Sequence, residues 1–253
     1  MISFIEKPNL PQNEVETVAI SITAGEAIKE LNSLSIKTIL IESDNNLPEG
    51  INSHADLQLL HLEKNKIMIP KSNEQLFGVL NNKGYSIELT ENLSLEYPGD
   101  VLLNAKIVGD YIICNKKTVS RKVLDYSEKE SMKIIDVNQG YAGCSVCVLN
   151  ENAIITDDIS IFRAAQNFLN DVTLIKKNTI RLKNYNYGFI GGCCGKISKN
   201  EIAFNGSLMS HTDYKLIADA LNRNNIKAVE LHNGILEDIG GILPLTEKQH
   251  FQP

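Results

Sequence analysis

The sequence lacks long apolar runs, an excess of basic residues and an export signal. No apolar stretch approaches the ~20 residues that a membrane-spanning helix requires. A formal net charge of −6 argues against nucleic acids and anionic membranes as partners, because both are normally bound by a basic face. The first residues, MISFIEKPNLPQNE, show no basic segment followed by an apolar one. We therefore expect no signal peptide, and the cytoplasm is the predicted compartment.

Sequence motifs for nucleotide binding and serine hydrolysis are also missing. The chain contains neither G-x-x-x-x-G-K-[ST] nor a G-x-G-x-x-G that follows a predicted strand. It contains no G-x-S-x-G nucleophile elbow either. The sequence therefore predicts no nucleotide dependence and no cofactor.

Disulfides are not expected, because the cysteine number is odd, at five, and no export signal is present. Cys144-x-x-Cys147 together with Cys193-Cys194 offers four thiols of the kind that bind zinc. However, side chains three apart in a strand point to opposite faces, and a vicinal pair is poorly spaced for a metal. We therefore predict no metal site, and nothing around the C-x-x-C favours a thioredoxin-like redox role.

The chain instead contains an internal repeat. Its 253 residues, 43% of them apolar, can bury the core of one domain, predicted to span residues 1–253. Five motifs recur: SHADLQLL, YPGDVLLN, YAGCSVCVL, GGCCGKIS and LEDIGGIL. Their anchors, Asp56, Asp100, Cys144, Cys193 and Asp238, are 44, 44, 49 and 45 residues apart.

The elements around each anchor follow one order. Apolar residues spaced three and four apart predict helices in AGEAIKELNSL, SNEQLFGVLNNKG, SRKVLDYSEKES, SIFRAAQNFLN and HTDYKLIADALNRN. Ser72, Ser160 and Ser210 are the predicted N-caps of three of them. A short strand follows each helix: IKTILIE, YSIELT, MKIIDV, VTLIK and IKAVEL. After each of the first four motifs, a polar turn predicts a hairpin that ends in KIMI, YIIC, AIITD or EIAF.

These units predict an α/β propeller with pseudo-fivefold symmetry. The fifth unit lacks its second hairpin strand, whereas VETVAISI near the N-terminus is a spare strand. We expect this strand to close the ring and remove the open edge. A doubly wound parallel sheet, the alternative, explains the alternating helices but not the repeated hairpins.

A ring of five such units resembles the pentein fold of the guanidino-group-modifying enzymes, which include arginine and agmatine deiminases, dimethylargininases and amidinotransferases. His54-Ala55-Asp56 resembles the H-x-D element of these enzymes, and Cys144 in GCSVCVL resembles their nucleophile. In this chain, as in these enzymes, the unit with the cysteine comes two units after the unit with the H-x-D element. LEDIGG resembles their E-G-G-D element, although its acidic residues precede the glycine pair and the motif order is circularly shifted.

The resemblance implies a cysteine-dependent hydrolase or amidinotransferase that acts on a small cationic guanidino or amidine compound. Cys144 would be the nucleophile and His54 the acid/base, and a reactive cysteine is expected to be partly exposed with a lowered pKa. The predicted substrate-binding residues are Asp56, Asp100, Glu237, Asp238, Cys193 and Cys194.

Each candidate also has a structural explanation. Cys144 suits a buried packing position, Pro98-Gly99-Asp100 is typical of a turn, and the glycines around Cys193 and Cys194 indicate tight packing of the backbone.

The remaining histidines are weaker candidates. His211 opens a predicted helix, and His61 and His250 are expected to be incidental.

A different class of function remains open. The fold also resembles that of the ribosome anti-association factor of translation initiation, a non-catalytic pentein. The chain would then be a binding module with a protein or small-molecule partner. The sequence does not indicate the oligomeric state.

Overall fold

The structure is a computed structural model and describes residues 2–249, so His250 lies outside the described residues. The helices are α1 (Gly25–Ser33), α2 (Ala55–Gln58), α3 (Glu74–Asn82), α4 (Arg121–Lys129), α5 (Ile159–Ala165) and α6 (Tyr214–Arg223). The strands are β1 (Ile2–Phe4), β2 (Val15–Ser21), β3 (Lys37–Ile41), β4 (Leu60–Glu63), β5 (Lys66–Pro70), β6 (Ser86–Thr90), β7 (Lys106–Val108), β8 (Tyr111–Cys114), β9 (Lys133–Asp136), β10 (Val146–Asn150), β11 (Ala153–Thr156), β12 (Asp171–Leu174), β13 (Cys194–Ser198), β14 (Glu201–Phe204), β15 (Lys227–Glu230) and β16 (Leu243–Lys248).

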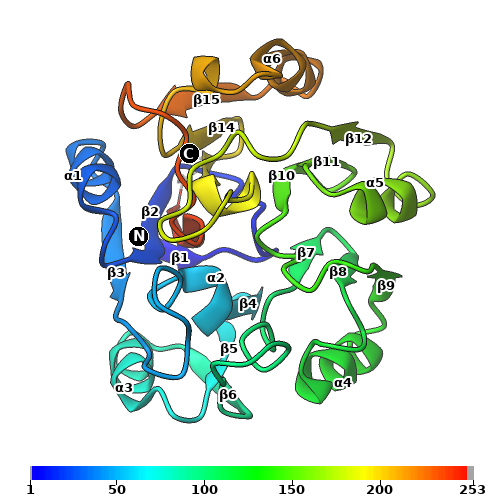
Figure 1. Ribbon diagram of the computed structural model, residues 1–253. Coiled ribbons are helices and arrows are strands. Elements are labelled where there is room, and N and C mark those ends of the chain that lie inside the picture. The colour runs from blue at the N-terminus through cyan, green and yellow to red at the C-terminus, as the bar shows by residue number, and fades with distance from the viewer. Residues whose placement is uncertain (1, 250–253) are drawn as a thin grey trace.

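The strands form five separate small sheets arranged in a ring (Figure 1). Four sheets have three strands, β4-β5-β6, β7-β8-β9, β10-β11-β12 and β13-β14-β15, and the fifth has the order β1-β16-β2-β3. In each three-stranded sheet an antiparallel hairpin is followed by a helix and then by a parallel strand. The predicted five-unit α/β propeller is confirmed, and the doubly wound alternative is wrong because the strands do not form one continuous sheet.

The two ends of the chain share the fifth sheet. β2 pairs with β16 in antiparallel fashion and with β3 in parallel fashion, and β1 lies on the outer side of β16. The N-terminal segment VETVAISI therefore supplies a strand next to the C-terminal one. The five sheets stay separate within residues 2–249, so this pairing does not close a continuous sheet as a barrel would.

The helices lie on the outer rim, as Figure 1 shows for α1, α3, α4, α5 and α6. They are amphipathic, and each turns its apolar side inward. For example, Leu31 of α1, Leu80 of α3 and Ile217 of α6 are completely buried. Burial of such a side chain stabilises the fold by about 1.5–3 kcal/mol, so the core lies between each outer helix and its sheet. No helix within residues 2–249 has the length and apolarity of a membrane span.

The three predicted N-caps are wrong by one to three residues. Asn73 rather than Ser72 caps α3, because its side chain accepts a hydrogen bond from the Leu76 amide. Asp158 caps α5 and accepts from the amides of Ser160 and Ile161, so Ser160 lies inside the helix. Ser210 ends a short 3₁₀ helix instead, and α6 starts only at Tyr214.

Candidate active site

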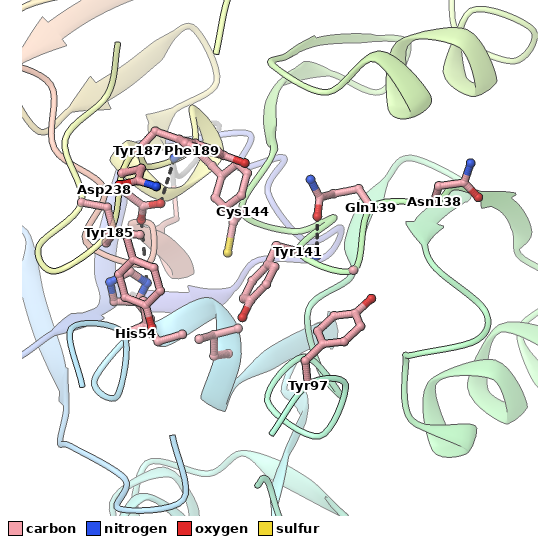
Figure 2. A pocket seen from close by; sticks show the side chains of 15 residues that line it. His54, Tyr97, Asn138, Gln139, Tyr141, Cys144, Tyr185, Tyr187, Phe189 and Asp238 are labelled. Atoms are coloured by element: carbon pink, nitrogen blue, oxygen red, sulfur yellow. Dashed lines mark hydrogen bonds and ion pairs between the residues drawn. The ribbon is translucent and has the colours of Figure 1, made fainter. Parts of the chain in front are cut away.

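The loops that precede the hairpins converge near the axis of the ring and enclose a cavity of about 420 Å³. Three predicted site residues line it: His54, Cys144 and Asp238 (Figure 2). They come from the first, third and fifth motifs, so residues far apart in the sequence meet here. Five aromatic side chains also line the cavity: Tyr97, Tyr141, Tyr185, Tyr187 and Phe189.

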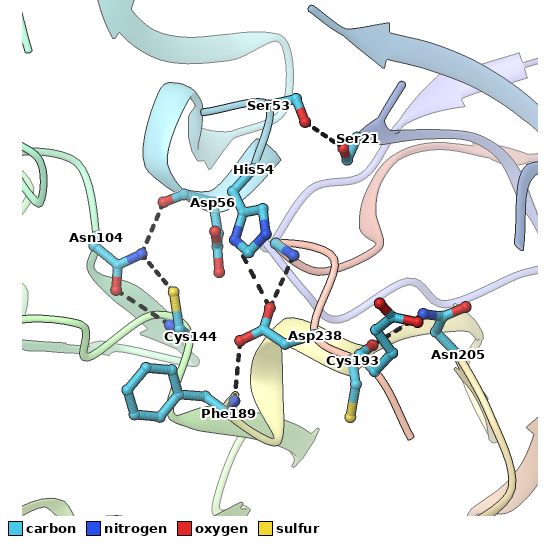
Figure 3. Close-up of polar contacts among 12 residues, drawn as sticks. Ser21, Ser53, His54, Asp56, Asn104, Cys144, Phe189, Cys193, Asn205 and Asp238 are labelled. Atoms are coloured by element: carbon cyan, nitrogen blue, oxygen red, sulfur yellow. Dashed lines mark hydrogen bonds and ion pairs between the residues drawn. The ribbon is translucent and has the colours of Figure 1, made fainter. Parts of the chain in front are cut away.

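Cys144 lies two residues before β10 and is held by one asparagine. Its peptide nitrogen donates to Asn104 Oδ1 at 3.1 Å, and Asn104 Nδ2 lies 3.1 Å from the sulfur (Figure 3). The same Nδ2 donates to the carbonyl of Asp56 at 3.0 Å. Asn104 therefore fixes the cysteine loop to the loop that carries the H-x-D motif.

The environment of Cys144 favours the neutral thiol. The residue is only 2% exposed, and burial raises the pKa of its thiol well above the usual value. The negative charges of Asp56 and Asp238 raise this pKa further, while the Asn104 hydrogen bond opposes the change. The expected exposure and lowered pKa are therefore absent from the ligand-free protein.

His54 and Asp238 form a pair beside the cysteine. His54 Nδ1 lies 3.8 Å from Asp238 Oδ1, which also accepts a hydrogen bond from the Gly240 amide at 2.9 Å. The other oxygen of Asp238 accepts from the Phe189 amide at 2.9 Å. Burial raises the pKa of Asp238 to about 6, against the effect of these two donors, and burial lowers the pKa of His54. At neutral pH the imidazole is therefore uncharged and able to accept a proton.

Asp56 lies in α2 beside His54 and is buried, and it does not itself line the cavity. Neither of its carboxylate oxygens has a hydrogen-bond partner of normal geometry among the described residues, and the nearby Cys144 thiol is the one group placed to donate to it. Burial raises the pKa of this carboxyl group, and His54 and Lys106 oppose the increase. A buried carboxylate with so few donors is unfavourable, and a cationic ligand with N–H groups would relieve this.

Asp100 and Glu237 do not line this cavity. Asp100 is buried and accepts a hydrogen bond from the Tyr141 hydroxyl, so it orients a wall residue. Glu237 forms an ion pair with Arg181 at 2.5 Å and lines a second cavity of about 440 Å³. His54 and Asp238 also line that second cavity, so the pair lies between the two spaces. Direct substrate contact from Asp100 or Glu237 is therefore not supported.

Cys193 and Cys194 do not line the cavity either. Both are buried in the hydrophobic core shared by the third sheet, the fourth sheet and α6, and the Cys193 thiol donates to the Ile190 carbonyl. No group of three or more His, Cys, Asp or Glu among residues 2–249 has the arrangement of a metal site.

The neighbouring glycines have a structural reason. A β-carbon on Gly192 would lie 2.0 Å from Asp238 Oδ1, and one on Gly195 would lie 1.8 Å from the Ile242 carbonyl oxygen. The predicted close backbone approach is thus present, and it packs the fourth motif against the fifth.

His61 and His211 lie outside this cavity. His61 is buried in β4, where Nε2 lies 2.8 Å from the Lys64 carbonyl oxygen. His211 Nδ1 accepts a hydrogen bond from the Asp213 amide, which is a local turn contact. Neither histidine therefore contacts the residues of the candidate site that line this cavity.

A Gly192→Ala substitution tests the packing around Asp238. We expect it to lower the free energy of unfolding by about 1–3 kcal/mol, because the carboxylate must move to admit the methyl group. Gly78→Ala is the matched control: it lies in α3 with no atom within 4 Å of the added carbon, and it should stabilise by roughly 0.5–1 kcal/mol. Urea denaturation of both variants measures the difference. Equal stability of Gly192→Ala and the parent protein would contradict the observed approach.

The aromatic wall was not predicted from the sequence. Tyr185, Tyr187 and Phe189 alternate within five residues, a pattern that could have indicated side chains directed toward one space. The segment has no regular strand or helix, so hydrophobic periodicity does not reveal it. Asn104 was missed for a different reason: a lone amide gives no sequence signal until the fold brings it to the cysteine.

Comparison with solved structures defines the class of fold. The inosamine-phosphate amidinotransferase of Streptomyces griseus superposes with a TM-score of 0.59 at 10% identity, covering 98% of both chains. The agmatine deiminase of C. jejuni gives a TM-score of 0.55 at 13% identity, covering 93% of this chain and 94% of the other. DDAH from Pseudomonas aeruginosa, solved with citrulline, gives a TM-score of 0.54 at 10% identity, covering 93% of this chain and 100% of the other.

This chain therefore has the pentein fold, as its sequence motifs indicated. Within that class, the sequence matches one family over residues 19–243, and the chain belongs to that family of unknown function, DUF6873. A search of curated proteins finds no match.

Proposed function

We propose that this protein is a cysteine-dependent enzyme that cleaves a C–N bond of a guanidinium or amidinium compound. The observation that supports it is one cavity lined by Cys144, His54 and Asp238, with the buried carboxylate of Asp56 next to the Cys144 thiol. A thiol, a neutral imidazole and carboxylates are the groups that amidine chemistry requires. Enzymes with this fold include an agmatine deiminase and two amidinotransferases, which makes the same chemistry a natural hypothesis here.

In the first step, Asp56 and Asp238 bind the planar cation. The substrate brings a positive charge next to Cys144, and this offsets the two carboxylates that raise the thiol pKa. The thiol proton passes to the neutral His54, and the sulfur attacks the central carbon. The S–C bond forms, the bond from carbon to the leaving nitrogen breaks, and the imidazolium returns its proton to the departing amine.

In the second step, the amidino group on Cys144 passes to a second nucleophile. His54 accepts a proton from that nucleophile, the new bond to carbon forms, and the S–C bond breaks to restore the thiol. Water would give a urea-type product, as in hydrolysis, and an amine would give a new guanidine, as in amidino transfer. Both outcomes use the same residues, so the proposal covers either class of reaction.

Alkylation of Cys144 tests this proposal with a matched pair of reagents. Chloroacetamidine carries an amidinium cation, whereas chloroacetamide is its neutral counterpart. Relative to free cysteine, we expect Cys144 to prefer the cationic reagent by at least about 10-fold, because two carboxylates attract it. Peptide mass spectrometry measures the rates at Cys144. The neutral reagent should react slowly, with an apparent pKa above the free-thiol value of ~8.5, because burial favours the thiol.

Two variants complete the experiment. His54→Ala should slow reaction with chloroacetamidine, because the thiol loses its proton acceptor. Cys114→Ser is the control for background labelling, since Cys114 is buried in β8, well away from this chemistry. If the ratio of the two alkylation rates equalled that of free cysteine, cation binding would be contradicted. That result would favour the non-catalytic binding module, which no observation supports.

We also propose the cytoplasm as the compartment. All five cysteines are free thiols, which suits a reducing environment. The partner we propose is a small cationic guanidino compound, with neither nucleic acid nor membrane as a ligand, consistent with the net charge of −6.

A further inference from the structure

The outer part of the cavity is a wall of aromatic rings. Tyr141 stacks on Phe189 with centroids 6.0 Å apart and on Tyr97 at 6.5 Å. Tyr187 meets Phe189 edge to face at 5.6 Å. Figure 2 shows Tyr185 beside His54 and Tyr141 on the other side of the Cys144 sulfur. A group that extends from the guanidinium into this cavity would therefore contact tyrosine and phenylalanine side chains.

No lysine or arginine of residues 2–249 lines this cavity. Two cations of neighbouring segments are already engaged, while Lys183, which follows the lining residue Leu182, lines the second cavity instead. Lys177 donates to Asp158 at 2.7 Å, and Arg181 pairs with Glu237. Lys106 is buried and faces a different, smaller cavity. The fixed charges near the reacting groups are thus the carboxylates of Asp56 and Asp238, which the charge of Lys106 partly offsets from outside this cavity.

An anionic tail is unfavourable in such a cavity. A carboxylate would lose its hydration among aromatic rings, find no cation to replace it, and face like charges at the inner end. The polar groups at the mouth are neutral amides. Gln139 is already engaged with Asp158 and with the Tyr141 amide, which leaves Asn138 and Asn186 for neutral hydrogen bonds.

We propose that the guanidino substrate of this site carries no carboxylate or phosphate, and that its tail is an aromatic or other flat apolar group stacked on the tyrosine wall. This inference rests on the proposed function and narrows its substrate class. It excludes arginine-like amino acids as the preferred substrates and favours substituted alkyl or aryl guanidines. The rings of Tyr141, Tyr185 and Phe189 would contact the tail, while Asp56 and Asp238 bind the cation.

The test uses two ligands that differ only in a carboxylate: 2-phenylethylguanidine and N-amidinophenylalanine. Isothermal titration calorimetry measures their affinities for the full chain. Because the chain has no tryptophan and eight tyrosines, tyrosine emission provides an independent readout near the cavity. We expect the uncharged tail to bind at least 10-fold more tightly. Butylguanidine, which has no ring, should bind about 2- to 10-fold more weakly than 2-phenylethylguanidine, the range that one aromatic stacking contact supplies.

Two variants test the two halves of the inference separately. Asn138→Arg introduces a cation at the exposed mouth and should improve binding of N-amidinophenylalanine selectively. Tyr185→Ala should weaken the binding of 2-phenylethylguanidine but leave the binding of methylguanidine unchanged. Tyr185 is 41% exposed, so the loss of its ring should spare the core.

The outcomes separate this inference from the proposed function. Equal or tighter binding of N-amidinophenylalanine would overturn the inference and leave guanidinium binding intact. If none of the guanidines bound, both would be overturned. If 2-phenylethylguanidine bound more tightly than N-amidinophenylalanine, and Tyr185→Ala reduced that binding, the preference for an uncharged tail that stacks on the tyrosine wall would be established.

Discussion

A Cys144→Ser variant should lose at least about 10³-fold in turnover of any guanidino substrate while keeping its fold, since removing the nucleophile from a catalytic unit has effects of this size or larger. The hydroxyl group is a far weaker nucleophile than a thiolate, and His54 is a weak base because its pKa is lowered by burial. Serine is similar in size and can still accept the Asn104 hydrogen bond. The loss would therefore be chemical rather than structural.

Acid quenching during turnover gives a second readout of the same prediction. The parent protein should carry an amidino adduct on the peptide that contains Cys144, and the serine variant should not. Cys114→Ser is the control for removal of a buried thiol, and it should keep turnover and adduct. Undiminished turnover by Cys144→Ser would exclude the covalent mechanism and leave the cavity with at most a binding role.

The architecture could be predicted because it repeats. Each unit shows the helical period, a short apolar strand and a polar turn, so an error in one unit does not alter the pattern of the other four. The helix that contains Leu31 and the one that contains Leu80 both occur where the periodicity predicts them. The helix starts were less accurate, because Asn73 and Asp158 lie within two residues of Ser72 and Ser160 and are equally good N-cap residues by type, and the fold uses Asn73 and Asp158.

The site was only partly predictable, because the repeat alone places some of its residues, whereas packing between units decides whether the others reach the cavity. His54 and Cys144 precede hairpins and Asp238 precedes β16, so the three occupy equivalent positions in their units and a repeat alignment suffices to bring them together. Asp100 occupies a similar position, but Tyr141 binds it and separates it from the cavity. Cys193 also precedes a hairpin, but the glycines around it bring the backbone rather than the thiol to Asp238. Such differences depend on packing between units, which one unit's sequence does not contain.

The thiol of Cys144 was expected to have a lowered pKa, and the structure shows the opposite. The sequence does not report burial, which is the largest cause of the increase. It also does not show that two carboxylates lie close to the sulfur. These carboxylates suppress the thiolate until a cation arrives, so the ligand-free protein would be protected against neutral electrophiles and oxidants. The resting pKa and the catalytic role are therefore compatible.

An Asp56→Asn substitution should make the protein more stable and a poorer guanidinium binder. Burial raises the pKa of the Asp56 carboxyl group, so the folded state is penalised once the pH exceeds the unfolded-state value and the group must ionise. The variant should gain about 1–3 kcal/mol in the free energy of unfolding at pH 8, and the gain should vanish near pH 4, where the native carboxyl group is protonated. Urea denaturation at both pH values measures this dependence.

The same variant should change the site in two further ways. The pKa of Cys144 should fall, because Asp56 is one of the charges that raise it, so chloroacetamide should react faster. The affinity for 2-phenylethylguanidine should drop at least about 10-fold, since a charge-assisted contact is lost. Asp110→Asn is the control: it removes one negative charge at an exposed position and should change neither property.

The combination distinguishes two explanations for a buried acid. Greater stability together with weaker guanidinium binding means that Asp56 is retained for a cationic ligand at the expense of the fold, as is common for residues of active sites. Lower stability with unchanged binding would mean that the carboxylate supports α2 and its loop instead. In that case the cation would be bound by Asp238 alone, and the two-carboxylate grip in the proposed first step would be wrong.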